Sequence, residues 1–316
     1  MHKPLTILDI ARLSGVGKST VSRVLNQDPK VKDETRERVN AVIREHGFEP
    51  SKSARSMRTR SPRLIGIIVS RLDSASENRS VRGILETLYA RGYDAMLMES
   101  EFSPDKTDEH LALLARRGVD GLILFAFTGL DLDKLADWRD RLVLIARPWP
   151  GLASVCHDDE GAIALMLQHL LAQGLRHIGF VGVHAEDVTT GGQRLAGYLR
   201  VCTEQGLEPH YALGELDYQS GYQLAARLLQ PQTQALVCAT DTIALGVAKY
   251  LQEVGRADVV VTGVGNNALL RFLFPKVMSV DLGYKRAGHL AAEQLLAQIE
   301  SGAAPCQLQA PSQLVE

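Results

Sequence analysis

Residues 17–23 of this 316-residue chain carry several side chains that could contact a nucleic acid. Lys18 and Arg23 suit the acceptor edge of guanine, while the hydroxyl groups of nearby Ser and Thr residues suit phosphates or either base. The candidate DNA contacts in and around this segment are Thr6, Gly17, Lys18, Ser19, Thr20, Ser22, Arg23 and Asn26. These residue types predict a DNA-reading surface, although any small helical pair also carries surface Lys and Arg.

A second set of polar side chains, beyond residue 63, suits a phosphorylated sugar. Carboxylates and amides such as Asp73, Asp187 and Asn266 offer fixed acceptors and donors for sugar hydroxyls. Three arginines accompany them, which exceeds what a neutral sugar requires, and Arg forms bidentate pairs with phosphate. The three are Arg71, Arg147 and Arg194. Internal Arg–Asp pairs are the competing interpretation of the same residues.

The basic segment belongs to a pattern of two short amphipathic helices within residues 6–25. Thr6 followed three residues later by Asp9 predicts a capping box at the first helix. Gly15 supplies the sharp turn between the helices. Apolar residues at helical spacing predict the inner faces, namely Ile7, Ile10, Ala11, Val16, Val21, Val24 and Leu25. The outward residues of the second helix are then Lys18, Ser19, Ser22 and Arg23. This arrangement is a helix-turn-helix, which typically reads DNA.

Charge is divided unevenly along the chain. Residues 1–60 contain 13 Lys or Arg and 7 Asp or Glu, a formal charge of +6. The remaining residues contain 22 and 30, a formal charge of −8. A polyanion-binding module fused to a domain that does not need nucleic acid gives this division. A solvated basic surface would give it as well.

A third helix and a linker complete the N-terminal part. Residues 33–46 carry an apolar stripe and precede Gly47, a typical helix stop. Lys32 occupies the N-cap position, where it is a poor choice, although Asp33 and Glu34 favour the helix dipole. Residues 48–62 are polar and basic and include two prolines. Because this linker contains no glycine, it could form a short helix on binding a partner.

The rest of the chain alternates short apolar runs with helical patterns. The runs are 64–69, 95–98, 121–125, 142–146, 178–183, 235–239 and 259–264. Continuous apolar strands between helices predict parallel sheets buried on both faces, and their number suits two sheets in two lobes. Ligands of such sheets bind beyond the carboxyl ends of the strands. The candidate site residues follow these ends, which predicts a polar ligand cleft.

Other chemistry finds little support. The four cysteines are scattered without CxxC spacing, which is typical of buried thiols in a cytoplasmic protein and makes a metal site improbable. Residues 157–159, His-Asp-Asp, are explained by capping of the following helix. We expect no signal peptide and no membrane span. No nucleophile elbow, P-loop or zinc-peptidase motif occurs, so we predict a non-enzyme without a cofactor. The alternative is a sugar-binding or sugar-processing α/β protein with an incidental helical head.

This order of elements resembles the LacI/GalR family of bacterial repressors over essentially the whole chain. Pro50, Ala54-Arg55 and Met57 match the family's linker motif. The resemblance implies a hinge helix that folds on operator DNA and inserts an apolar side chain into the minor groove. It adds Ser53, Ala54 and Met57 to the DNA contacts, Met57 standing where Leu is more usual. The implied protein is a homodimer with a DNA-binding domain at 1–48, a hinge at 49–62 and a periplasmic-binding-protein-like core at 63–316.

Two loops point to one branch of this family. Residues 70–78 and 187–191, with the more widely shared 5–26 and 153–162, resemble repressors of trehalose operons. The resemblance implies trehalose 6-phosphate as the effector. The implied contacts are Arg71, Leu72, Asp73, Ser74, Ala75, Ser76, Glu77, Ala126, Arg147, Asp187, Val188, Thr189, Thr190, Arg194, Thr242 and Tyr284, and the strand-end rule adds Asp241. Most of them follow predicted strand ends. Arg147 is followed by a stiff turn, Pro148-Trp149-Pro150.

Overall fold

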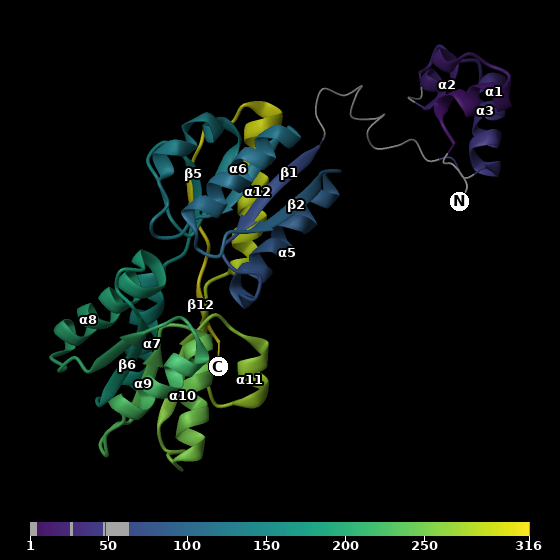
Figure 1. The fold of residues 1–316 in the computed structure, drawn as a ribbon. Helices are drawn as coiled ribbons and strands as arrows, with labels where there is room; N and C mark the ends of the chain where they lie inside the picture. The colour runs from purple at the N-terminus through teal and green to yellow at the C-terminus, as the bar shows by residue number, and fades with distance from the viewer. Residues whose placement is uncertain (1–4, 26–27, 47, 49–62, 316) are drawn as a thin grey trace. The chain divides into compact units, whose positions relative to one another are not determined.

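The computed structural model describes residues 5–25, 28–46, 48 and 63–315. The chain divides into two compact units, Met1–Pro62 and Arg63–Glu316. The described residues of the first unit form three helices, and those of the second form two sheets with covering helices (Figure 1). Among the described residues, none of the helices has both the length and the apolar composition needed to span a bilayer.

The helix-turn-helix is formed by α1 (Ile7–Ser14) and α2 (Lys18–Leu25). Thr6 and Asp9 form the predicted capping box, with the Thr6 amide donating to the Asp9 carboxylate at 2.9 Å. Gly15 adopts the left-handed conformation, at φ 64°, that ends the first helix and starts the turn. Both predictions are therefore confirmed, because local capping chemistry alone determines these features.

A small apolar core holds α1 and α2 against α3 (Asp33–Glu45). Ile10, Val21 and Val39 are fully buried in it, and Phe48 closes it from beyond the last helix. The prediction that Ser22 faces outward is wrong, since Ser22 is buried with only 5% of its surface exposed. Its position next to Val21 puts it at the edge of the buried face, where a small side chain fits. Lys32 makes no side-chain cap bond, as predicted.

The first lobe of the second unit is built on a six-stranded sheet in the order β11-β5-β4-β3-β1-β2, with all neighbours parallel. Its strands are β1 (Leu64–Val69), β2 (Asp94–Glu99), β3 (Gly121–Phe125), β4 (Leu142–Ile145), β5 (Ala153–Cys156) and β11 (Gln307–Gln309). Its helices are α5 (Ala75–Ala90), α6 (Pro104–Arg117), the 3-10 helix η1 (Leu132–Arg141) and α12 (Tyr284–Ser301). Helices α5 and α12 pack side by side (Figure 1).

The second lobe has the corresponding order β12-β10-β9-β8-β6-β7, in which only the β10–β12 pair is antiparallel. Its strands are β6 (Ile178–Val183), β7 (Tyr211–Gly214), β8 (Ala235–Cys238), β9 (Val260–Val264), β10 (Met278–Asp281) and β12 (Gln313–Val315). Its helices are α7 (Asp159–Ala172), the π-helix η2 (Val188–Gln193), α8 (Arg194–Gln205), α9 (Tyr218–Leu228), α10 (Asp241–Glu253) and α11 (Ala268–Leu273).

The two-sheet prediction is confirmed, with small differences at strand ends. Residue 146 is not part of β4, because Ala146 takes a positive φ of 81° that turns the chain. Five strands were not predicted, and each is only three or four residues long; they are β5, β7, β10, β11 and β12. Short strands give too little apolar pattern to distinguish them from loops.

The chain passes between the lobes three times. The passages follow β5, β10 and β11. Because both sheets are parallel apart from the β10–β12 pair, the loops at the carboxyl ends of their parallel strands meet between the lobes. This geometry places loops from distant parts of the sequence around one cavity.

Candidate DNA-reading surface and ligand pocket

The second helix of the helix-turn-helix presents a basic, exposed face. Lys18, Ser19 and Arg23 are exposed at this surface, together with Gly17 in the turn. The Arg23 side chain is 63% exposed and its closest ionic partner, Asp28, lies 3.9 Å away. Such a loosely held guanidinium can exchange its partner for a base edge or a phosphate.

The other predicted DNA contacts have different surroundings. Thr20 is half-buried, and the Thr6 hydroxyl donates to Asp9 at 2.7 Å within the capping box. The buried Ser22 is poorly placed to meet a groove. The remaining predictions lie outside the described residues and concern Asn26, Ser53, Ala54 and Met57.

A cavity of about 290 Å³ lies between the lobes and is lined by loops of both. Most predicted effector contacts line it, namely Arg71, Asp73, Ser74, Ala75, Ser76, Glu77, Ala126, Asp187, Thr189, Thr190, Arg194, Asp241, Thr242 and Tyr284. Three predicted contacts, Leu72, Arg147 and Val188, are not part of this lining. The rule that ligands sit beyond strand ends therefore identifies the loops, whereas the orientation of each side chain depends on its local partners.

Arg71 follows β1 and extends toward the second lobe. Its Nη1 donates to the Leu216 carbonyl at 3.1 Å. Its Nε and Nη2 donate to the two carboxylate oxygens of Asp73 at 2.8 and 2.9 Å. The bond to Asp73 raises the pKa of Arg71 and lowers the pKa of Asp73. Arg71 thus links the lobes while its fork holds an anion at the pocket.

Arg194 occupies a different environment, deep beneath the pocket. It is 4% exposed and pairs with Asp159, whose carboxylate lies 2.8 Å from Arg194 Nε and 2.6 Å from Nη2. It also donates to the Ala239 carbonyl and, at 3.5 Å, to the Tyr284 hydroxyl. Burial lowers the pKa of Arg194, but the charges and hydrogen bonds of Asp159 and Tyr284 together outweigh burial and raise it. For this arginine, the internal Arg–Asp interpretation accounts for the bonds.

Arg147 is not among the residues that line the cavity, although it contacts one of them. Its Nη1 donates to the Phe127 carbonyl at 2.8 Å. The preceding residue, Ala146, has a left-handed φ of 81°, and Trp149 donates from Nε1 to Asp133 at 3.2 Å. Arg147 therefore contacts the neighbouring loop of the same lobe through the Phe127 carbonyl.

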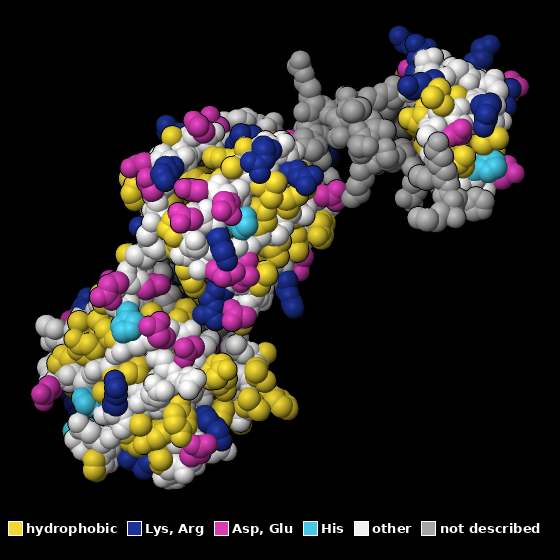
Figure 2. Space-filling model, viewed as in Figure 1, with side chains coloured by type: hydrophobic (Ala, Val, Ile, Leu, Met, Phe, Trp, Pro, Cys, Tyr) yellow, Lys and Arg dark blue, Asp and Glu magenta, His cyan; other side chains and the backbone are white. Residues whose placement is uncertain are grey.

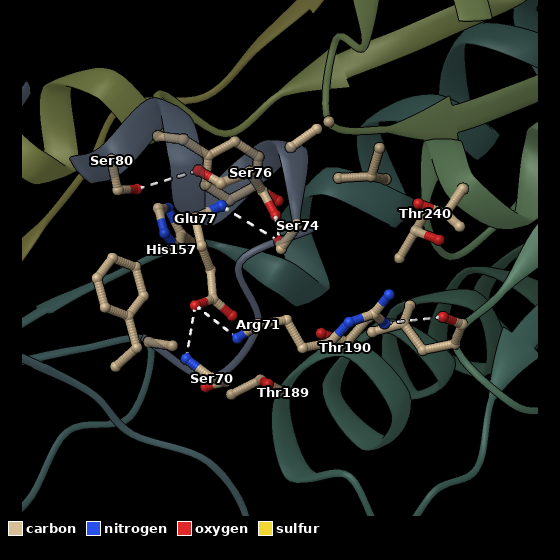
Figure 3. Close-up of a pocket in the computed structure, with 18 of the residues that line it drawn as sticks. Ser70, Arg71, Ser74, Ser76, Glu77, Ser80, His157, Thr189, Thr190 and Thr240 are labelled. Carbon is tan, nitrogen blue, oxygen red and sulfur yellow. Dashed lines mark hydrogen bonds between the residues drawn. The ribbon is translucent and has the colours of Figure 1, made fainter. Parts of the chain in front are cut away.

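Glu77 is the buried acid of the pocket. It lies in the first turn of α5 and points to the backbone of the preceding loop (Figure 3). Its Oε2 accepts from the Ser70 amide at 2.7 Å and from the Arg71 amide at 3.3 Å. Burial raises the pKa of Glu77 to about 7, because it outweighs these bonds. Near neutral pH this carboxyl is therefore divided between its neutral and its charged form.

Two further carboxylates hold the backbone around the cavity. Asp187 caps η2 by accepting from the Thr189 amide at 3.1 Å. Asp241 accepts from the Asn267 amide at 2.6 Å and from the Ser279 hydroxyl at 2.8 Å. Burial raises the pKa of Asp241. Since these groups already have donors, they shape the pocket as much as they offer acceptors.

Several lining residues were missed by sequence reasoning, above all aromatic ones. Phe102 follows β2 and meets Phe127 edge-on, with ring centroids 5.6 Å apart. Tyr218 enters from the second lobe at the start of α9. The strand-end rule could have found Phe102, because the sequence predicts the apolar run of β2. It could not have found Tyr218, because Tyr218 follows β7 and that strand was not predicted. Aromatic faces suit sugar rings, so these residues add apolar walls to a polar site.

The fold and site define a class of proteins that join a DNA-reading helix-turn-helix to a two-lobed, periplasmic-binding-type domain with a ligand pocket. A model for the lacI family of bacterial regulatory proteins matches residues 6–51, and one for the periplasmic binding protein-like domain matches residues 167–316. The chain is 51% identical over 314 residues to the transcriptional regulators TreR of Salmonella typhimurium and Escherichia coli, covering 99% of this chain and 100% of each relative. The chain belongs to the lacI family of bacterial regulatory proteins. It is a transcriptional repressor of this type with a DNA-binding helix-turn-helix.

Solved structures agree with this placement. The trehalose repressor from Escherichia coli is 47% identical, with a TM-score of 0.78 over 80% of this chain and 99% of that one. The lac repressor dimer bound to operator and an anti-inducer has a TM-score of 0.89 over 99% of this chain and 98% of that one. At 23% identity, this second likeness shows the fold alone.

Proposed function

We propose that this repressor binds an operator through its helix-turn-helix and responds to trehalose 6-phosphate bound between the lobes. The main support for this proposal is the pocket lining, in which the guanidinium group of Arg71 lies among carboxylates, hydroxyls and aromatic faces. A disaccharide phosphate needs this combination, because its hydroxyls require fixed polar partners and its phosphate a bidentate cation. The similarity to the trehalose repressor from Escherichia coli supports an effector derived from trehalose.

The proposed contacts are not equal in kind. Arg71 is positioned for the phosphate, while Asp187, Thr190 and Thr242 are positioned for hydroxyls. Arg194 supports the pocket floor by holding Asp159 and Tyr284. Arg147 acts through the Phe127 loop rather than through the ligand. This assignment leaves one arginine, Arg71, to bind the phosphate, whereas the sequence suggested three.

We further propose a homodimer, with one helix-turn-helix on each half-site of a near-palindrome and the 49–62 segment as a hinge between residues 1–48 and the core at 63–316. Exposed apolar side chains gather over α11 (Figure 2), including Leu269, Phe272 and Leu273. Phe272 is 83% exposed, which is unusual for a large apolar residue and supports burial against a second copy. The proposal requires no catalysis and places the protein in the bacterial cytoplasm with its operator.

Coupled binding tests this function. Full-length protein is titrated onto a duplex selected from a random library, with and without trehalose 6-phosphate, trehalose, glucose 6-phosphate or inorganic phosphate. We expect trehalose 6-phosphate to weaken DNA binding and DNA to weaken effector binding by the same factor. Equal effector affinity with and without DNA contradicts the switch. Binding of trehalose 6-phosphate no tighter than inorganic phosphate contradicts the effector.

A further inference from the structure

The Arg71–Asp73 pair has the geometry of an arginine holding a phosphate. Two parallel N–H···O bonds, of 2.8 and 2.9 Å, join the guanidinium fork to both oxygens of the carboxylate. Phosphate oxygens are bound by Arg in the same bidentate way. Both residues line the cavity. The fork that suits a ligand phosphate is therefore occupied by an anion of the chain itself.

This anion is held loosely. The Asp73 side chain is 72% exposed, whereas the Asp159 carboxylate on Arg194 is 4% exposed. An exposed ion pair is weak because water screens it, and a phosphate dianion makes stronger charge-assisted bonds than a carboxylate. A ligand phosphate can therefore replace Asp73 on Arg71, while it cannot replace Asp159 on Arg194.

The two sides of the Arg71 guanidinium have separate partners. Nε and Nη2 face Asp73, and Nη1 donates to the Leu216 carbonyl of the second lobe. Exchange of Asp73 for phosphate leaves the Nη1 bond in place. The phosphate is then held by a side chain that also contacts the opposite lobe.

We propose that Asp73 is an intramolecular competitor that occupies the fork of Arg71 until a phosphorylated ligand displaces it. The inference rests on the proposed function, because it assumes that a sugar phosphate binds this pocket. Only two positions separate Asp73 from Arg71, so its local concentration at the fork is high and constant. A neutral sugar has no group that replaces a carboxylate there. Asp73 thereby sets how far the pocket discriminates between a sugar phosphate and the free sugar.

Calorimetric titration of the full-length protein tests this role. Asp73→Asn removes the competing charge and keeps the shape of the side chain. We expect Asp73→Asn to bind trehalose 6-phosphate about three- to tenfold more tightly than wild type. The gain is of this size because an exposed ion pair is populated only a few-fold more than its unpaired state. Trehalose affinity should change by less than about twofold, since no phosphate competes.

A matched control lies elsewhere in the same lobe as Leu216. Arg256 and Asp258 form the same bidentate pair at the same spacing, with Nε–Oδ1 and Nη2–Oδ2 both at 2.9 Å, and the pocket lining does not include them. Asp258→Asn should leave the affinity for both ligands unchanged. In an Arg71→Ala background, Asp73→Asn should no longer tighten binding, because the fork is absent.

The outcomes separate the inference from the proposed function. If wild type binds trehalose 6-phosphate and Asp73→Asn binds it more weakly, Asp73 positions Arg71 and the inference is wrong. The inference is also wrong if Asp73→Asn gains the same affinity for trehalose as for trehalose 6-phosphate, because the gain is then unrelated to the guanidinium fork of Arg71. If wild type binds no sugar phosphate, the proposed effector is wrong and the inference falls with it.

Discussion

Arg71 and Arg194 line the same pocket and each holds an aspartate, yet they serve different purposes. Arg194 joins the first turns of α7 and α8 from within the protein, with Asp159 almost completely buried. Arg71 lies on a loop, and its partner Asp73 is largely exposed. A buried ion pair cannot release its charges without a large desolvation cost, while an exposed pair exchanges partners readily. We therefore propose that exposure of the acid, rather than the presence of an arginine, distinguishes a ligand-binding arginine from a structural one.

The strongest test of this contrast is removal of the buried guanidinium. Arg194→Ala leaves the Asp159 carboxylate buried without its cation, so we expect the free energy of unfolding to fall by about 3 to 5 kcal/mol. Denaturant unfolding of the full-length protein measures this loss. The adjacent pair of Arg200 with Glu160, at 2.6 Å, is exposed and joins the same two helices. Arg200→Ala should leave the unfolding midpoint unchanged, and equal losses for both variants would contradict the distinction.

Glu77 provides a second test through pH. Burial raises its pKa from 4.5 to about 7, so the folded protein binds a proton there more tightly than the unfolded chain. The resulting stability is fully present below pH 4.5 and is lost as pH rises through about 7. The total is about 3 kcal/mol from a shift of this size. Glu77→Gln should remove this part of the pH dependence, which unfolding measured at several pH values detects. An unchanged slope would show that Glu77 is solvated in the native protein.

Features determined by local chemistry could be predicted from the sequence. The Thr6–Asp9 capping box and the Gly15 turn depend only on neighbouring residues. The strands 64–69 and 121–125 are buried along nearly their whole length and show it as continuous apolar runs. The strand-end rule then places the loops of Arg71 and Asp187 at one pocket, because it depends on topology alone.

Features determined by residues far apart in the sequence could not be predicted from it. Strands β11 and β12 in the C-terminal tail form only because β5 and β10 offer edges to pair with. The burial of Ser22 depends on how three helices pack. Arg194 meets Asp159 across 35 positions of sequence, and neither residue type reveals this pairing. Sequence patterns therefore identified three candidate arginines but could not say which one keeps a displaceable partner.

For the exposed arginine, Arg71, we expect the opposite outcome to that for Arg194, namely a loss of ligand affinity with little loss of stability. Arg71→Ala should weaken binding of trehalose 6-phosphate by about 1.5 to 3 kcal/mol, as expected for loss of hydrogen bonds to a charged group. Trehalose should lose much less affinity, and stability should change by less than about 1 kcal/mol, because the pair with Asp73 is exposed. Calorimetric titration with both ligands and denaturant unfolding give the three values. Equal losses for the two sugars would assign Arg71 to hydroxyls or to the scaffold.

Arg23 extends the comparison to the helix-turn-helix, where it is another exposed arginine with a distant acidic partner. Its guanidinium lies 3.9 Å from Asp28, farther than a good hydrogen bond, so exchange for a base edge requires little disruption of the protein. Arg23→Ala should weaken binding to the selected duplex by about 1 to 3 kcal/mol and relax sequence preference at one position. Arg12→Ala, which removes an exposed arginine of α1 beside Asp9, is the control and should have a smaller effect. Fluorescence anisotropy against a set of single-base variants measures both quantities. A loss of the same size on every duplex would mean that Arg23 contacts phosphate, so that an exposed, loosely paired arginine supplies anion affinity in the helix-turn-helix, as we propose for Arg71 in the pocket.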